Sequence, residues 1–126
     1  MRILVADDHE TVRKGICAIL GSRRDFEVCG EAANGADAVE QAVALKPDLV
    51  ILDITMPVLG GFGAAKELKR LLPKVPILFF SMHDGPRFIE EAKKAGVRGF
   101  VAKDRAGETL LTAADALLRG QTFFPG

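Results

Sequence analysis

Five short apolar runs alternate along the chain with longer stretches of helical period. The runs are rich in β-branched and large apolar residues, lack polar alternation, and cover residues 3–6, 26–30, 49–52, 77–80 and 99–102. Runs of this kind are typical of strands in a parallel sheet that is covered on both faces. We therefore expect five buried strands.

The stretches between the runs carry apolar residues at the spacing of one helix face. The last stretch shows this most clearly, with Leu110, Ala113, Ala114, Leu117 and Leu118 at offsets of three, four, seven and eight. Strict alternation of strand and helix predicts a parallel sheet with right-handed crossovers. The expected fold is a single doubly wound α/β domain with helices on both faces.

Length and charge limit the function classes. The chain has 126 residues, 48% of them hydrophobic, which suits one core. We expect a domain over residues 1–119, followed by a tail at 120–126 that could begin a linker to an absent output domain. With 17 basic and 17 acidic residues the net charge is zero, so direct nucleic-acid binding by this chain is not expected.

Neither a targeting segment nor a zinc site is expected. The apolar start at residues 3–6 is too short for a signal peptide or membrane span, which predicts a cytoplasmic protein. Cys17 and Cys29 are interpreted as packed thiols. His9 and His83 are interpreted as exposed loop residues, with His83 at the rim of the site described next.

Four of the five predicted strands are followed by a polar or charged residue. They end in Asp7-Asp8, Asp53, Ser81 and Lys103. Ligands of open α/β sheets bind outside the carboxyl ends of the strands, so we expect these side chains to meet at one edge.

Together these residues can carry out one reaction. Clustered carboxylates repel one another unless a cation lies among them, and hard oxygen ligands suit Mg²⁺. An Asp carboxylate can also attack phosphorus to form an aspartyl phosphate. Mg²⁺, the Lys103 ammonium and the Ser81 hydroxyl would then stabilise the transferring group on Asp53.

Each residue also has an ordinary structural interpretation. Asp8 could cap the helix that starts near Glu10, Ser81 could be a turn residue, and Lys103 could be a solvated lysine. Asp53 is harder to explain in this way, because a carboxylate at a buried strand end is costly without a partner. The prediction depends on the coincidence of all four positions.

At this point the chain resembles the receiver domain of two-component response regulators, a CheY-like superfamily. The resemblance is carried by Asp7-Asp8, Asp53-Ile54-Thr55-Met56-Pro57, Ser81 and Gly99-Phe100-Val101-Ala102-Lys103, which occur in family order over essentially the whole chain. It implies a flavodoxin-like (βα)5 fold with strand order 2-1-3-4-5.

The resemblance also implies roles for these positions. Asp53 would accept phosphate from a phosphohistidine on a sensor histidine kinase, and Ser81 and Lys103 would contact the phosphoryl group. Mg²⁺ would be held by Asp8, Asp53 and the Thr55 backbone carbonyl, with Asp7 acting through water. Phe100 matches an aromatic switch position whose ring turns inward as Ser81 moves, and ordinary core packing is the alternative.

Details of the loops are similar to the NarL/FixJ (LuxR-type) subfamily. These are Asp-Asp-His at residues 7–9, Ser-Met-His at 81–83 and Lys-Asp at 103–104. The likeness implies control of a DNA-binding transcriptional output domain, with a homodimer through the fourth helix, fifth strand and fifth helix on phosphorylation. The chain departs from the family at Asp104, Gly60 and Gly63, where proline, an acidic or amide residue, and an acidic residue are usual.

Two other functions compete with a phosphorylated switch. A phosphohydrolase of the haloacid dehalogenase type also uses an aspartyl nucleophile with Mg²⁺, but its motif needs a second Asp two residues later, where this chain has Thr55. A receiver that binds partners without phosphate is the other alternative, and the complete polar set argues against it. We expect no enzymatic turnover of a separate substrate.

Overall fold

The computed structural model describes residues 1–82 and 85–125. Its strands are β1 (Arg2–Ala6), β2 (Glu27–Ala32), β3 (Leu49–Leu52), β4 (Ile77–Ser81) and β5 (Gly99–Ala102). Its helices are α1 (Glu10–Gly21), α2 (Gly35–Leu45), α3 (Gly61–Leu71), α4 (Pro86–Lys94) and α5 (Ala106–Leu118), with a 3₁₀ turn η1 (Lys103–Arg105) before α5. The predicted alternation of five strands with five helices is confirmed.

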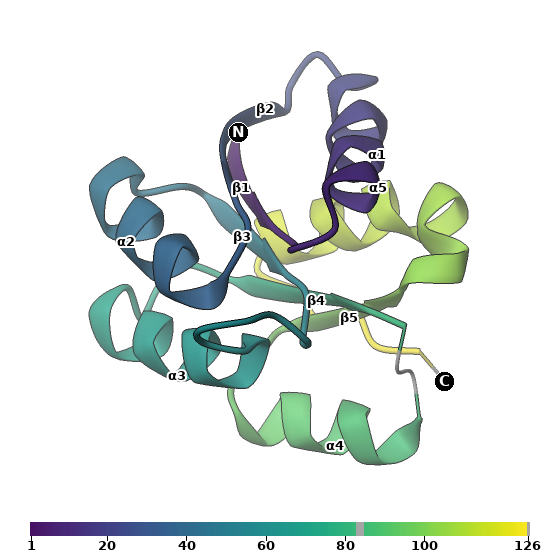
Figure 1. The fold of residues 1–126 in the computed structure, drawn as a ribbon. Helices are drawn as coiled ribbons and strands as arrows, with labels where there is room; N and C mark the ends of the chain where they lie inside the picture. Colours follow the sequence, from purple (N-terminus) through teal and green to yellow (C-terminus); the bar gives the residue numbers. More distant parts are fainter. Residues whose placement is uncertain (83–84, 126) are drawn as a thin grey trace.

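The sheet is parallel, with strand order β2-β1-β3-β4-β5. Helices α1 and α5 cover one face, and α2, α3 and α4 cover the other (Figure 1). The doubly wound α/β fold and the 2-1-3-4-5 order are therefore confirmed. This topology brings the carboxyl ends of β1 and β3 side by side in the middle of the sheet, next to that of β4.

Each face of the sheet has its own hydrophobic core. Alternate residues of one strand point to opposite faces, so Val50 and Leu52 contribute to the core under α2, α3 and α4, whereas Leu49 and Ile51 contribute to the core under α1 and α5. All four side chains are fully buried. This explains why β3 has no polar alternation in the sequence.

The helices differ in how firmly they are anchored. Helix α5 has five buried residues: Ala106, Leu110, Ala113, Ala114 and Leu117. In helix α4 only Ala92 is buried. Phe88 and Ile89 of α4 are partly buried against the core. Because buried apolar area is the main source of helix anchoring, α4 is attached to the sheet less firmly than α5.

The segment after α5 returns to the sheet. Gly120 adopts a φ of 81°, and the chain then runs along the outer edge of β5, where Phe123 forms a parallel bridge with Gly99. From the sequence we expected a tail at residues 120–126. We did not predict that it would pair with β5.

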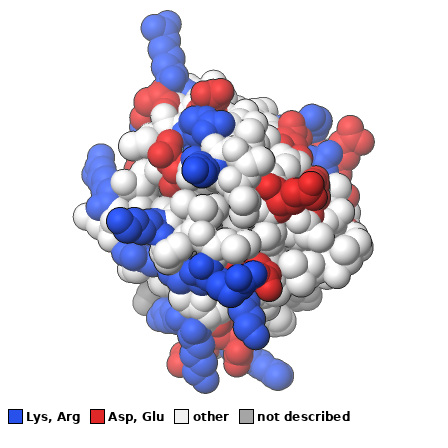
Figure 2. Space-filling model, turned by 90° about the vertical axis from the view of Figure 1, so that its left-hand side faces the viewer, with Lys and Arg blue, Asp and Glu red and all other residues white. Residues whose placement is uncertain are grey.

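The surface carries both signs of charge. Figure 2 shows Lys and Arg side chains alongside Asp and Glu side chains on the face that it displays. This agrees with a net charge of zero. Within the described residues, no helix combines the length and the apolar character that crossing a membrane requires.

Candidate functional site

The predicted polar residues meet at the carboxyl edge of the sheet. A hollow of about 150 Å³ opens there, lined by His9, Asp53, Thr55, Ser81, Met82 and Lys103. These residues come from the loops after β1 and β3, from the end of β4 and the residue after it, and from η1, as expected from the strand order. His83, which we expected at the rim, lies outside the described residues.

Asp7 lies at the base of the site and is completely buried. Its N–H donates to the carbonyl of Ala32 at 3.0 Å, which continues the β1–β2 ladder beyond the strand. Its Oδ1 accepts the backbone N–H of His9 at 2.9 Å. Its Oδ2 accepts no hydrogen bond from other described residues and instead lies 2.8 Å from Lys103 Nζ.

Asp53 follows β3 directly and is 3% exposed. Its Oδ2 lies 3.4 Å from Lys103 Nζ, and its Oδ1 accepts the Thr55 N–H in a long contact of 3.4 Å. Burial raises the pKa of Asp53 above its usual range, and repulsion by Asp7 raises it further, whereas Lys103 opposes both effects. Ionisation of Asp53 is therefore less favourable in this site than in water.

Lys103 is the cation that bridges the two buried carboxylates. It is the first residue of η1, and its side chain is only 11% exposed. One ammonium facing Asp7 and Asp53 leaves an excess of negative charge, and Asp8 at the rim adds to it. A further cation in the hollow would offset that excess.

The ligand atoms offered by this edge are close enough for a single metal ion. One atom from each of Asp7, Asp8, His9 and Asp53 lies within 4.8 Å of the others. Opposite ligands of octahedral Mg²⁺ are about 4.2 Å apart, because each metal–oxygen distance is about 2.1 Å. The residues present therefore fit a magnesium site.

Asp8 does not cap α1. The N-cap of that helix is His9, and no side-chain cap hydrogen bond is made there. The Asp8 carboxylate instead faces the imidazole, with His9 Nδ1 3.2 Å from Asp8 Oδ1. The alternative interpretation of Asp8 as a helix cap was wrong, and an Asp8 carboxylate oxygen lies near those of Asp7 and Asp53.

His9 is the residue that the sequence interpretation missed. We expected an exposed loop histidine, and its side chain is indeed 65% exposed, but its Nδ1 also lies 3.4 Å from Asp7 Oδ1. The only signal in the sequence was its position directly after the Asp7-Asp8 pair. Imidazole nitrogen is a good ligand for transition metals and a poor one for Mg²⁺.

The loop after Asp53 is tightly constrained. A Cβ on Gly61 would come within 2.5 Å of the Asp53 carbonyl oxygen, so only glycine fits at the start of α3. Val58 has a φ of 68°, and the Leu59 N–H donates to the Pro57 carbonyl at 2.7 Å, which closes a γ-turn. A β-branched residue is strained in this conformation, and Val58 is 83% exposed with little packing to compensate.

Ser81 and Phe100 occupy different environments. Ser81 is 1% exposed and lines the hollow at the end of β4. Phe100 is fully buried and belongs to the core under α2, α3 and α4. The structure therefore brings Asp7, Asp53, Ser81 and Lys103 together with Asp8 and Thr55 at the rim, and places Phe100 outside the hollow.

Comparison with known proteins agrees with this geometry. Residues 3–115 match the family described as response regulator receiver domain. The chain is 34% identical over 124 residues to the uncharacterized transcriptional regulatory protein YxjL of Bacillus subtilis (strain 168), covering 98% of this chain and 57% of that protein. It is 33% identical to the response regulator protein VraR of Staphylococcus aureus (strain NCTC 8325 / PS 47), covering 98% of this chain and 59% of VraR.

Solved structures are similar as well. A LuxR-family two-component response regulator from Aurantimonas sp. SI85-9A1 superposes with a TM-score of 0.94 at 33% identity, covering 98% of this chain and 88% of that one. The chain thus spans less than two thirds of the length of these curated relatives and most of the solved chain.

Proposed function

The chain belongs to the response regulator receiver family, and on that premise we propose that Asp53 accepts a phosphoryl group from a histidine kinase in a Mg²⁺-dependent reaction. The observation that carries the proposal is the contact of one ammonium, Lys103 Nζ, with both Asp7 at 2.8 Å and Asp53 at 3.4 Å beside Ser81. A buried carboxylate that faces a cation across a small open hollow can act as a nucleophile.

The transfer would proceed by displacement at phosphorus. An Asp53 carboxylate oxygen forms the new O–P bond while the N–P bond of the phosphohistidine breaks, and the electron pair of that bond leaves with the imidazole nitrogen. Lys103 keeps its proton and neutralises the equatorial oxygens, and the Ser81 hydroxyl donates a hydrogen bond to them. Mg²⁺ held by Asp8, Asp53 and the Thr55 carbonyl, with Asp7 acting through water, would supply additional positive charge there.

The first test uses a small phosphodonor. The protein is incubated with acetyl phosphate and Mg²⁺, and intact mass is measured for the wild type, Asp53→Asn and Lys94→Gln. We expect one phosphoryl adduct in the wild type and in Lys94→Gln, which changes an exposed lysine remote from the site, and none in Asp53→Asn. An adduct that persists in Asp53→Asn would refute Asp53 as the acceptor.

The two competing functions give different results in the same assay. If the wild type binds Mg²⁺ but never forms an adduct with acetyl phosphate or with a phosphorylated kinase, a phosphate-independent interaction module becomes the better explanation. Continuous release of phosphate from a phosphomonoester would favour the hydrolase. Thr55 takes the position of the required second Asp, and its N–H contacts Asp53 Oδ1, so we expect no such turnover.

The proposed output is control of a DNA-binding domain outside this chain. The names of YxjL and VraR, a transcriptional regulatory protein and a response regulator, support this for proteins of similar sequence. Phosphorylation would add roughly two negative charges at Asp53 and favour a homodimer through α4, β5 and α5. Light scattering should show the molar mass double on addition of beryllofluoride, a phosphoryl mimic, and an unchanged monomer would rule out this dimer.

Phe100 is proposed to respond to phosphorylation. Its ring is already fully buried in this structure, so an inward switch requires an outward rotamer in part of the unphosphorylated population. NMR of ring-labelled phenylalanine should show two exchanging Phe100 environments that collapse to one with beryllofluoride. A single unchanged environment would leave ordinary core packing as the role of this residue.

A further inference from the structure

Residues 121–125, here called the strap, pair with the free edge of β5 as a sixth strand would. The Phe100 N–H donates to the Phe123 carbonyl at 2.8 Å, and the Phe123 N–H donates to the Arg98 carbonyl at 3.0 Å. These two bonds lie on either side of Gly99, the bridge partner of Phe123. The strap therefore satisfies backbone groups of the edge strand that carries Phe100.

The side chains of the strap alternate as those of a strand do. Phe123 packs against the core under α1 and α5, whereas Phe124 packs against the core under α2, α3 and α4. Gly99 permits this close approach, because a Cβ there would lie 2.8 Å from Leu117 Cδ1 and 3.2 Å from the Phe123 carbonyl oxygen. The strap thus contacts both layers of the molecule from one edge.

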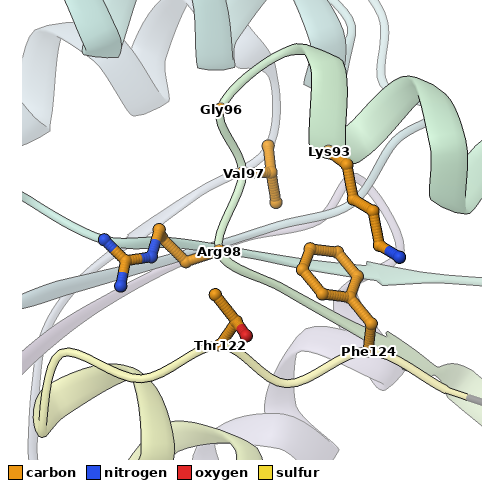
Figure 3. Close-up of a pocket in the computed structure, with 6 residues that line it drawn as sticks. All are labelled: Lys93, Gly96, Val97, Arg98, Thr122 and Phe124. Atoms are coloured by element: carbon orange, nitrogen blue, oxygen red, sulfur yellow. The ribbon is translucent and has the colours of Figure 1, made fainter.

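Phe124 joins β5 to the less firmly anchored helix α4. Lys93 Nζ lies 5.0 Å from the centroid of the Phe124 ring, within range of a cation–π interaction. Figure 3 shows the Phe124 ring between Lys93 of α4 and the start of β5. Ala92 is the only fully buried residue of α4, and Phe88 and Ile89 pack against the core as partly buried residues, so the Phe124–Lys93 contact adds a further attachment near the C-terminal end of the helix.

The strap is attached without filling the space around it. An open hollow of about 650 Å³ lies between the strap and the end of α4, lined by Lys93, Gly96, Val97, Arg98, Thr122 and Phe124. Gly120 ends α5 before the strap with a φ of 81°, its N–H donates to the Leu117 carbonyl at 3.0 Å, and its carbonyl accepts a hydrogen bond from the Arg98 guanidinium at 2.5 Å. Two backbone bonds hold the strap to β5, and a third, from the Gln121 N–H to the Ala116 carbonyl at 2.9 Å, holds its first residue to α5. Residues 122–125, with two bonds to β5 and partly buried rings, can therefore leave the sheet edge without unfolding the domain.

We propose that residues 121–125 are a detachable strap that clamps α4 to the edge of β5 and is thermodynamically coupled to occupancy of the Asp53 site. The coupling rests on the proposed function. Lys103 directly follows β5, and its ammonium must keep its place beside Asp7 and Asp53 to meet a phosphoryl group. A docked strap fixes the edge of β5 and so preorganises Lys103.

Coupling of this kind is reciprocal. If the strap improves binding at Asp53, occupancy of Asp53 must tighten the strap by the same factor. Docking therefore favours the occupied state, and occupancy favours docking. If phosphorylation instead released the strap, docking of the strap would weaken binding at Asp53.

The clamp is tested by amide hydrogen exchange on the full chain. Phe124→Ala should speed exchange of the Phe123 and Phe100 amides at least tenfold while leaving the Phe79 amide of β4 unchanged. Gln121→Ala, at an exposed strap position, is the matched control and should leave all three amides unchanged. Unchanged protection of Phe123 in Phe124→Ala, with a folded far-UV spectrum, would refute the clamp.

The contact with α4 has its own matched pair. Lys93→Gln and Lys94→Gln remove the same charge from neighbouring exposed positions, and only Lys93 lies over Phe124. We expect the Phe123 amide to exchange about threefold faster in Lys93→Gln and at the wild-type rate in Lys94→Gln. Equal effects of the two substitutions would show that general charge, not this contact, holds the strap.

The coupling is tested with beryllofluoride and Mg²⁺. In the wild type, saturation should slow Phe123 exchange about three- to tenfold, and Phe124→Ala should weaken beryllofluoride binding by a similar factor. Equal affinities with unchanged exchange, or faster exchange on binding, would overturn the coupling. If the wild type binds no beryllofluoride, the proposed function fails and the coupling with it, while exchange in the free protein still decides whether the clamp exists.

Discussion

Strand β3 and the loop that follows it, residues 53–60, are adjacent in the chain and have opposite physical properties. Every side chain of Leu49–Leu52 is apolar and fully buried. The loop begins with a buried carboxylate of raised pKa, continues to an exposed valine at a φ of 68°, and leads into a glycine that touches the Asp53 backbone.

The difference separates residues that stabilise the fold from residues that serve the site. Burial of β3 contributes stability on both faces of the sheet. Charge repulsion at Asp53 and backbone strain at Val58 reduce it. Because unfavourable features of this kind collect at functional sites, substitutions in the strand should destabilise the protein, whereas substitutions that relieve the repulsion at Asp53 or the strain at Val58 should stabilise it.

The largest effect is expected in the strand. Ile51→Ala removes a fully buried side chain and should lower the free energy of unfolding by about 2–5 kcal/mol. Urea unfolding followed by far-UV circular dichroism is the suitable measurement, because the chain has no Trp or Tyr. Val43→Ala, at a position 43% exposed, is the control. A loss below about 1 kcal/mol for Ile51→Ala would contradict the assignment of β3 as the stabilising region.

Asp53→Asn should stabilise the metal-free protein at neutral pH. The native state raises the pKa of Asp53, so the folded chain binds this proton more tightly than the unfolded chain, and wild-type stability falls as the pH rises above the ordinary value of 3.8. The melting temperature of Asp53→Asn in EDTA should exceed that of the wild type at pH 7, and the gap should narrow as the pH falls towards 3.8. A gap that is the same at both ends of this range would mean that Asp53 ionisation is not its cause.

Mg²⁺ should compensate for the charge repulsion. At ten times its Kd, it should stabilise the wild type by about 1.4 kcal/mol. Asp8→Asn removes an oxygen ligand and should abolish most of this gain. His9→Asn is the matched control at the next position and should keep it, because Mg²⁺ prefers oxygen. Equal losses in the two variants, measured by thermal melts with and without Mg²⁺, would argue against the ligand set proposed here.

The smallest effect is expected at Val58. Asparagine tolerates a positive φ better than valine, and Val58 has little packing to lose, so Val58→Asn should gain up to about 1 kcal/mol. Val43→Asn, on an exposed helix position with ordinary backbone geometry, should give no gain. Destabilisation by Val58→Asn in urea unfolding would show that the loop is not strained at this residue.

Much of the fold and part of the site could be predicted from local pattern. Strands β3 and β5 begin and end where the apolar runs do, β1 and β4 differ from prediction by one residue at one end, and β2 differs by one residue at its start and two at its end. The polar residues after the strands were identified because a charged side chain at the end of a buried strand costs free energy unless it has a partner. His9 and the pairing of the strap were not predicted, because neither leaves a periodic signal.

The sequence by itself determined the order of strands and helices and the position of the polar residues at the strand ends. Strands buried on two faces and amphipathic helices each give a recognisable pattern in consecutive residues. Contacts between distant segments decided the rest. Lys103 contacts Asp7 and Asp53 across 96 and 50 positions of the chain, and Phe123 pairs with Gly99. The contacts of Lys103 depend on the spacing of neighbouring strands, and the pairing of Phe123 depends on which backbone groups remain unpaired at the sheet edge. Both are set only when the sheet has assembled.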